Sequence, residues 1–163
     1  MREVRGDIFK LANFIRDAVV IPTSIGWKKD GSNPMGKGLA REAARRFPTL
    51  PITYGEFCML QGEHTPVQMD RYTGPAGGRW LVLFPTKALN KAMPHMSWQG
   101  KASPPLIERG LRQLSVFEPP TPNGKIYVPL LGCGWGGLHR DAVRELMDRY
   151  LTAECFVRVR WAH

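Results

Sequence analysis

The amino-acid sequence predicts an α/β fold, a layered sandwich in which helices cover a mixed sheet. Two observations carry this prediction. Short apolar runs rich in β-branched and aromatic residues alternate with three longer segments whose apolar residues recur at helical spacing. The last apolar run, CFVRVRW, instead alternates apolar residues with arginines, which is typical of a strand with one solvated face.

The elements follow from these patterns in order along the chain. Apolar faces predict helices over residues 39–47, 106–117 and 142–151. Asp141 is placed to cap the last helix or to charge its first turn. Apolar runs predict buried strands over residues 18–21, 57–60, 80–84 and 126–131, and a strand with Arg158 and Arg160 on its solvated face over residues 157–161. The segments 73–78 and 118–124, rich in proline and glycine, are expected to be surface loops or turns.

Length and composition limit the organisation and the partners. A chain of 163 residues with 43% hydrophobic content is expected to form one domain over residues 1–163. Lysine and arginine total 23 against 14 acidic residues, so the formal charge of +9 attracts polyanions such as nucleic acids, nucleotides or phosphorylated substrates. Arginines on the helix over residues 39–47 are expected to form its solvated face; they are Arg41, Arg45 and Arg46.

Cysteine and histidine positions bear on cofactors and location. Cys58, Cys133 and Cys155 form no CxxC pair and share no metal-ligand spacing with the four histidines, so no zinc site is expected. We also expect no cofactor. No apolar run approaches the roughly 20 residues of a membrane-spanning helix, and the N-terminal segment lacks a signal-peptide pattern. We therefore expect a cytoplasmic protein, a monomer that makes no contact with membranes.

Two glycine-rich loops follow predicted strands and precede predicted helices, which is where open α/β sheets bind ligands. The first places Gly36, Lys37 and Gly38 directly before Leu39, and the second has the sequence GCGWGG over residues 132–137. Glycine permits close backbone approach, and free N–H groups at a helix start attract anions. Either loop alone could be only a tight turn. Neither matches a Walker or GxGxxG motif, but a pair of such loops suits a diphosphate ligand.

Lys87 is the candidate nucleophile. It directly follows a buried strand, so its amine is held near the end of the sheet. Burial against apolar walls would lower its pKa and make it a nucleophile or a Schiff-base former, whereas the alternative is a solvated loop lysine. Asp7, in an early Gly-Asp-Ile-Phe segment, is by itself more often a turn former than a ligand contact.

Together, four motifs resemble the macrodomain family in their order and spacing: VRGDIF, PMGKGLAREAARRFP, FPTK and VPLLGCGWGGLHRDAV. The resemblance spans nearly the whole chain and is to the branch that contains the DarG antitoxin macrodomain and the terminal ADP-ribose glycohydrolase. It implies a three-layer α/β/α fold that binds ADP-ribose in a cleft between two loops, without a metal.

The resemblance also implies roles for single residues. Asp7 would accept a hydrogen bond from the adenine amino group, with Ile8 beside it. Lys87 would be catalytic and would attack or polarise the anomeric carbon of the distal ribose. The cleft near the distal ribose and diphosphate would be lined by Met35, Gly36, Lys37, Gly38 and Leu39, and the diphosphate would be cradled by Gly132, Cys133, Gly134, Trp135 and Gly136.

Two departures from the family bear on these roles. Pro22, Thr23 and Ser24 stand where the family usually carries asparagine, and a serine there could still bond a ribose hydroxyl. Gly136 stands where the terminal glycohydrolase has an acidic residue, so a mechanism that pairs a lysine with a carboxylate is not supported. Trp135 could stack on a ribose or nucleobase, or pack on its own loop.

The sequence is compatible with three functions. The favoured one is an ADP-ribosyl glycohydrolase that uses Lys87, with ADP-ribosylated DNA bases preferred over ADP-ribosylated protein because of the net charge. A module that binds ADP-ribose without hydrolysing it is the alternative, motivated by the altered residues 22–24. A nucleic-acid-binding protein that uses only its basic face is the third. The sequence identifies neither the linked base or side chain nor the biological setting.

Overall fold

The computed structural model describes residues 1–134 and 136–161. Within these ranges, six strands form one mixed sheet in the order β1-β6-β5-β2-β4-β3. The strands are β1 (Arg2–Arg5), β2 (Ala18–Ser24), β3 (Gln68–Gly74), β4 (Gly77–Lys87), β5 (Ile126–Pro129) and β6 (Phe156–Arg160). All neighbouring pairs are parallel except β3 with β4. The carboxyl ends of the five parallel strands therefore meet at one edge of the sheet.

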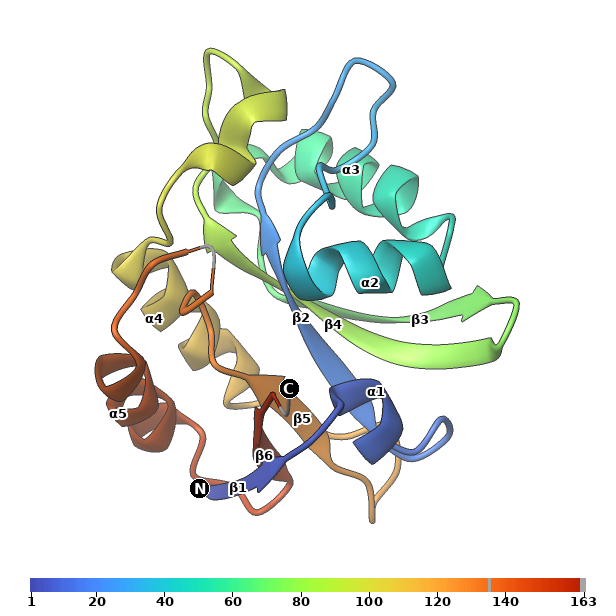
Figure 1. Cartoon of the computed structure of the whole chain (residues 1–163), viewed down its shortest axis with the longest axis vertical. Helices are drawn as coiled ribbons and strands as arrows, with labels where there is room; N and C mark the ends of the chain where they lie inside the picture. The colour runs from blue at the N-terminus through green and yellow to red at the C-terminus, as the bar shows by residue number, and fades with distance from the viewer. Residues whose placement is uncertain (135, 162–163) are drawn as a thin grey trace.

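Helices cover both faces of this sheet, with α4 and α5 on the left in Figure 1 and α2 and α3 on the right. One layer contains α1 (Ile8–Leu11), α2 (Gly38–Arg46) and α3 (Leu50–Gln61), and the other contains α4 (Pro104–Leu114) and α5 (Arg140–Tyr150). Two short 3-10 helices, η1 (Gly62–His64) and η2 (Pro94–Gln99), lie in the connections. The predicted three-layer α/β/α sandwich is confirmed.

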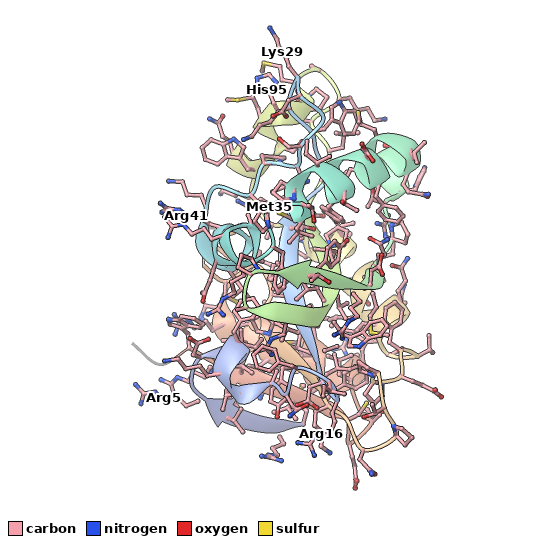
Figure 2. The ribbon with its side chains drawn as sticks, turned by 90° about the vertical axis from the view of Figure 1, so that its right-hand side faces the viewer. Arg5, Arg16, Lys29, Met35, Arg41 and His95 are labelled. Atoms are coloured by element: carbon pink, nitrogen blue, oxygen red, sulfur yellow. The ribbon has the colours of Figure 1, made fainter. Side chains whose placement is uncertain are left out.

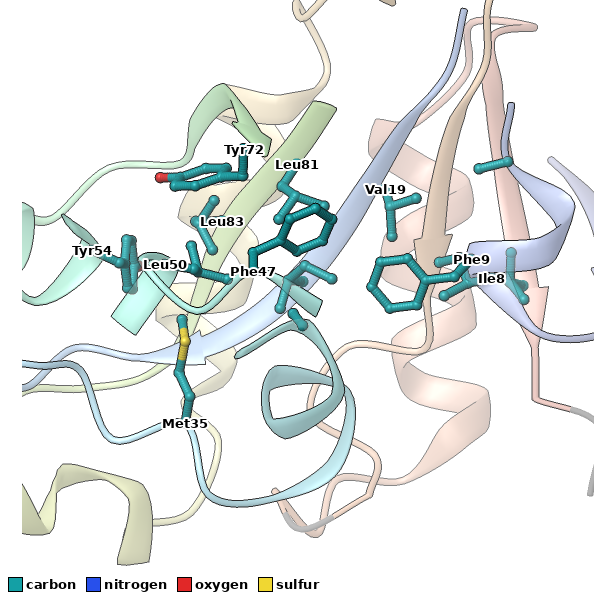
Figure 3. Packing of buried hydrophobic residues seen from close by; sticks show 14 of the residues in the cluster. Ile8, Phe9, Val19, Met35, Phe47, Leu50, Tyr54, Tyr72, Leu81 and Leu83 are labelled. Atoms are coloured by element: carbon teal, nitrogen blue, oxygen red, sulfur yellow. The ribbon is translucent and has the colours of Figure 1, made fainter. Parts of the chain in front are cut away.

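Alternate residues of the central strands belong to two hydrophobic cores, one on each face of the sheet. On β2, Val19 and Ile21 belong to the core under α1–α3, whereas Ala18 and Val20 belong to the core under α4 and α5. Figure 3 shows the first core, in which side chains from the helices and their connections meet β2 and β4. A strand covered on both faces is apolar along its length, which explains why the sequence shows an unbroken run there.

The predicted strand over residues 57–60 is wrong, because these residues form the last turn of α3. Cys58 is buried, whereas Met59 is exposed and Leu60 is 83% exposed. The apolar residues of α3 lie on all its sides, so no helical period is visible in the sequence. A four-residue apolar run then looks like a buried strand.

The predicted solvated face of the last strand is wrong at Arg158. This side chain is buried and forms ion pairs with Glu3 of β1 at 2.7 Å and Asp148 of α5 at 2.9 Å. An arginine can be buried here because its neighbours supply two carboxylates. Arg160 is exposed, as predicted.

Several boundaries also differ from the predictions. The strands of a hairpin continue through residues 73–78 and leave Pro75 and Ala76 as the turn. Helix α4 ends three residues before Phe117. Asp141 lies in the first turn of α5 and pairs with Arg144, so the second of its two predicted roles, a charge in the first turn, is confirmed. Segment 118–124 contains neither helix nor strand, as predicted. No helix in the described ranges is long and apolar enough to cross a membrane.

Candidate functional site

A cleft of about 1100 Å³ lies at the carboxyl ends of the parallel strands. The last residue of every parallel strand lines it, namely Arg5, Ser24, Lys87, Pro129 and Arg160. Open α/β sheets bind their ligands at this edge, and the volume suits a ligand of nucleotide size or larger. The cleft is therefore the candidate site.

Most residues predicted for the site meet in this cleft: Ile8, Thr23, Ser24, Gly36, Lys37, Gly38, Leu39, Lys87, Gly132, Cys133, Gly134 and Gly136. Met35 and Asp7 are outside its lining. Met35 is buried in the first core (Figure 3). The Asp7 carboxylate caps α1 by accepting a hydrogen bond from the Phe9 N–H at 2.9 Å. Trp135 lies outside the described residues.

The first glycine loop ends at the N-terminus of α2. Lys37 is the N-cap residue, and it makes no side-chain capping hydrogen bond. The following residues, Gly38, Leu39 and Ala40, carry the first N–H groups of the helix and line the cleft. Such N–H groups lack partners within the helix and attract anions. The first loop therefore offers the cleft an anion-binding helix end.

The second loop, residues 132–137, is a closed turn whose conformation depends on Gly132 and Gly136. Gly132 has φ +73°, and its carbonyl accepts a hydrogen bond from the Leu138 N–H at 2.9 Å. A Cβ on Gly136 would stand only 2.5 Å from that same carbonyl oxygen. By contrast, the space beside Gly134 and beside Gly36 of the first loop is open. These two glycines leave room for a ligand to approach the backbone.

Lys87 ends β4 inside the cleft, and its Nζ donates a hydrogen bond to the Trp98 carbonyl oxygen at 2.6 Å. Burial lowers the pKa of this amine. A lower pKa raises the fraction of neutral amine, which is the nucleophilic form. The register partner of Lys87 on β2 is Ser24, which lines the cleft beside it.

Two residues of η2, Trp98 and Gln99, line the cleft near Lys87 and were not predicted from the sequence. The segment packs closely on the loop after β2, since a Cβ on Gly26 would meet the Pro94 carbonyl oxygen at 2.3 Å. Figure 2 shows the two segments at one end of the molecule, where Lys29 and His95 are labelled. The sequence offers Pro94 at the start of this segment and Trp98 four residues later, but this pattern alone does not indicate a ligand site.

Residues at the end of β2 are fixed by buried partners. The Thr23 hydroxyl is hydrogen-bonded to the Tyr54 hydroxyl at 2.8 Å, and burial raises the pKa of Tyr54 so that it stays neutral. Asn33 donates from Nδ2 to the carbonyl oxygens of Ser24 at 2.8 Å and Gly26 at 3.0 Å. Thr23 is thus held by Tyr54 of α3, and Asn33 holds the backbone of the loop that follows β2.

The lining of the cleft is strongly cationic: Arg5, Lys28, Lys37, Lys87, Arg140 and Arg160. Among the described lining residues, Glu42 is the one carboxylate, and it pairs with Arg46 at 3.0 Å. Arg46 lies over the Phe9 ring, while Arg41 and Arg45 are exposed, as predicted for that helix face. Figure 2 shows Arg5 and Arg41 projecting from the same side of the molecule. Over residues 1–134 and 136–161, no three potential metal-ligating side chains gather.

No protein-family model matches the chain. The macrodomain of Thermus aquaticus DarG superposes with a TM-score of 0.66 and 28% identity, and the match covers 97% of this chain and 95% of that one. This chain folds as a macrodomain. The resemblance inferred from the four sequence motifs is confirmed.

Two further structures share the macrodomain fold. Thermosipho africanus DarTG in complex with ADP-ribose has a TM-score of 0.70 and 24% identity over 99% of this chain and 42% of that one. The macrodomain of Mycobacterium tuberculosis DarG has a TM-score of 0.66 and 22% identity over 99% and 97% of the two chains.

A curated relative is the DNA ADP-ribosyl transferase-DNA ADP-ribosyl glycohydrolase fusion protein of Thermosipho africanus. It is 29% identical over 134 residues, which cover 72% of this macrodomain and 32% of the relative. The chain therefore spans about one third of the length of that relative.

Proposed function

We propose that this macrodomain binds ADP-ribose in the cleft and hydrolyses the bond that joins it to a macromolecule, with ADP-ribosylated DNA as the favoured substrate. The observation that carries the proposal is Lys87, a lysine of lowered pKa that shares one cleft with the N-terminus of α2 and with the open backbone at Gly134. The DarG neighbours support it, since one of them is a complex with ADP-ribose. The cationic lining supports a nucleic-acid substrate.

The chemistry follows from the arrangement of the cleft. The diphosphate would lie between the N-terminus of α2 and the loop at residues 132–136, which would bring the distal ribose to Lys87. The neutral amine attacks the anomeric carbon as the bond from that carbon to the base breaks, through a transition state with oxocarbenium character. The departing base takes up a proton, which balances the proton that the alkylated amine releases. Water then cleaves the new C–N bond, which frees ADP-ribose and regenerates the Lys87 amine. The Trp98 carbonyl orients the amine through its hydrogen bond.

The first prediction concerns Lys87. Lys87→Ala removes the nucleophile but neither glycine loop, so turnover of an ADP-ribosylated oligonucleotide is expected to fall about 1000-fold or more while ADP-ribose still binds. Release of free ADP-ribose and calorimetric titration measure the two quantities. Lys91→Ala is the matched control, because Lys91 lies on the same connection, pairs with Glu63 and is outside the cleft lining. Undiminished turnover by Lys87→Ala would exclude the role of this lysine.

The second candidate is a module that binds ADP-ribose without hydrolysing it. The hydrogen bond between Thr23 and Tyr54 favours it, because this hydroxyl at the strand end already has a protein partner. Tight ADP-ribose binding with no release from either modified DNA or modified protein would establish this candidate. Release from one of the two conjugates would instead identify the substrate class.

A further inference from the structure

Three arginines line the end of the cleft beside β1 and β6, the strands of the parallel part of the sheet that lie farthest from β4 and Lys87. Arg5 and Arg160 are the last residues of β1 and β6, and they are register partners, so their side chains share one face of the sheet. Arg140 is the first residue of α5 and lines the same cleft. We name Arg5, Arg140 and Arg160 the arginine corner. All three are exposed.

Helix α5 brings Arg140 level with the two strand ends. Arg144, one helical turn later, contacts Glu3 at 3.2 Å, and Glu3 lies two residues before Arg5 on β1. One helical turn rises about 5.4 Å and two strand residues span about 6.6 Å. Arg140 therefore lies beside the register pair Arg5–Arg160, just as Arg144 lies beside the register pair Glu3–Arg158.

Around the register pair Glu3–Arg158, positive and negative side chains are paired. Arg144, Arg158 and the N-terminal amine meet the carboxylates of Glu3, Asp148 and Asp141 at 2.7–3.5 Å. In the arginine corner, no side chain of the described residues forms an ion pair or hydrogen bond with the three guanidinium groups.

The arginine corner has the charge and the exposure to bind an anion. Like charges directly opposite each other on neighbouring strands destabilise a sheet, and the N-terminus of α5 adds further positive potential. A bound phosphate would relieve both effects, since arginines bind phosphate through paired, charge-assisted hydrogen bonds.

The corner lies too far from Lys87 to serve the reacting ribose. Strands β6 and β1 are three and four places from β4 in the sheet, which corresponds to about 15–20 Å. A ligand with its reacting ribose at Lys87 and its diphosphate between the loops extends its adenosine toward the corner. The inference rests on the proposed function for this orientation of the ligand.

We infer that the arginine corner is a phosphate subsite, separate from the two glycine loops, for a phosphate that the substrate carries in addition to the diphosphate. Two sources supply this chemistry: a phosphate ester on the adenosine ribose, and the phosphodiesters of the modified strand where it runs along the cleft. Both predict that Arg5 and Arg160 act together on an additional phosphate.

The test compares Arg5→Gln/Arg160→Gln with Arg16→Gln/Arg149→Gln, which removes the same charge from exposed positions outside the cleft lining. Figure 2 shows Arg16 at the opposite end of the molecule from Lys29. One arm titrates ADP-ribose and ADP-ribose 2′-phosphate by calorimetry. The other titrates an unmodified single-stranded oligonucleotide of about 12 nucleotides.

A subsite for adenosine phosphate predicts that ADP-ribose 2′-phosphate binds about tenfold more tightly than ADP-ribose, and that the ratio falls to near one in Arg5→Gln/Arg160→Gln alone. A subsite for strand phosphates predicts that this variant weakens oligonucleotide binding at least fivefold more than the control variant does. If the two double variants behave alike in both arms, the arginine corner is no subsite. If wild-type protein binds no ADP-ribose, the proposed function fails, and the oligonucleotide arm still decides on the corner.

Discussion

The glycines of the two loops differ in what surrounds them. A side chain at Gly136 would collide with backbone, because its Cβ would stand 2.5 Å from the Gly132 carbonyl oxygen. A side chain at Gly134 would enter open space in the cleft. One position is therefore glycine because the loop must close, and the other leaves the backbone accessible to a ligand.

This difference predicts opposite phenotypes for two similar substitutions. Gly136→Ala forces the loop apart and is expected to lower the free energy of unfolding by about 1–3 kcal/mol. Gly134→Ala is expected to change stability by less than about 0.5 kcal/mol and to weaken ADP-ribose binding several-fold, because the methyl group occupies ligand space. Urea denaturation and calorimetry measure the two effects. Equal stability of the two variants would contradict the assigned roles.

At the scale of elements, an ion-pair network joins β1, β6 and α5. A hydrogen bond from Arg158 lowers the pKa of Glu3. Burial alone would raise the pKa of Asp148, but hydrogen bonds from the N-terminal amine and Arg158 lower it. A carboxyl pKa below its unfolded value stabilises the fold above the unfolded pKa of about 4, and this contribution is lost as pH falls through the folded pKa.

Arg158→Met tests the network. The substitution leaves carboxylates without their buried partner and is expected to cost about 1–3 kcal/mol near pH 7. The wild-type protein should lose part of its stability below about pH 4.5, and the variant should lose less over the same range. Melting temperatures between pH 7 and pH 3 check this, with Arg149→Met as an exposed control on α5. Parallel pH curves for wild type and Arg158→Met would count against the network.

Sequence patterns predict the elements that have one apolar face or a long buried run, and they fail for the others. Helix α3 carries apolar residues on all sides, and β1 is only four residues of mixed polarity, so neither shows a period. The glycine loops and Lys87 are predictable because their motifs are local. The arginine corner could not be predicted from the sequence, because the pairing of Arg5 with Arg160 depends on contacts between opposite ends of the sequence.

For the whole molecule, the positive charge is unevenly distributed. Outside the cleft lining, Arg46, Arg112, Arg144 and Arg158 pair with carboxylates. Six cations line the cleft, and the described lining contains one carboxylate, Glu42. The cleft therefore offers a polyanion a lining in which cations far outnumber carboxylates, within a chain of net charge +9.

Salt dependence measures how many of these cations contact nucleic acid. The affinity for single-stranded DNA is expected to fall with salt at a slope of about −0.7 per phosphate contact. Lys28→Gln removes a cleft cation and should reduce the slope by about 0.7. Lys10→Gln, at an exposed position outside the cleft lining, should leave it unchanged. An equal reduction by both variants would mean that the DNA binds over a diffuse surface.

The pairing of β1 also bears on the assembly of the sheet during translation. β1 occupies an edge of the sheet, and its strand partner is β6, which comes last in sequence among the six described strands. The segment with β2, α2, α3, β3 and β4 can pack earlier, because its strands pair with one another. Arg5 and Arg160 come together only when β6 has left the ribosome. A nascent chain can therefore hold Lys87 in a formed sheet while one end of its binding cleft is still incomplete.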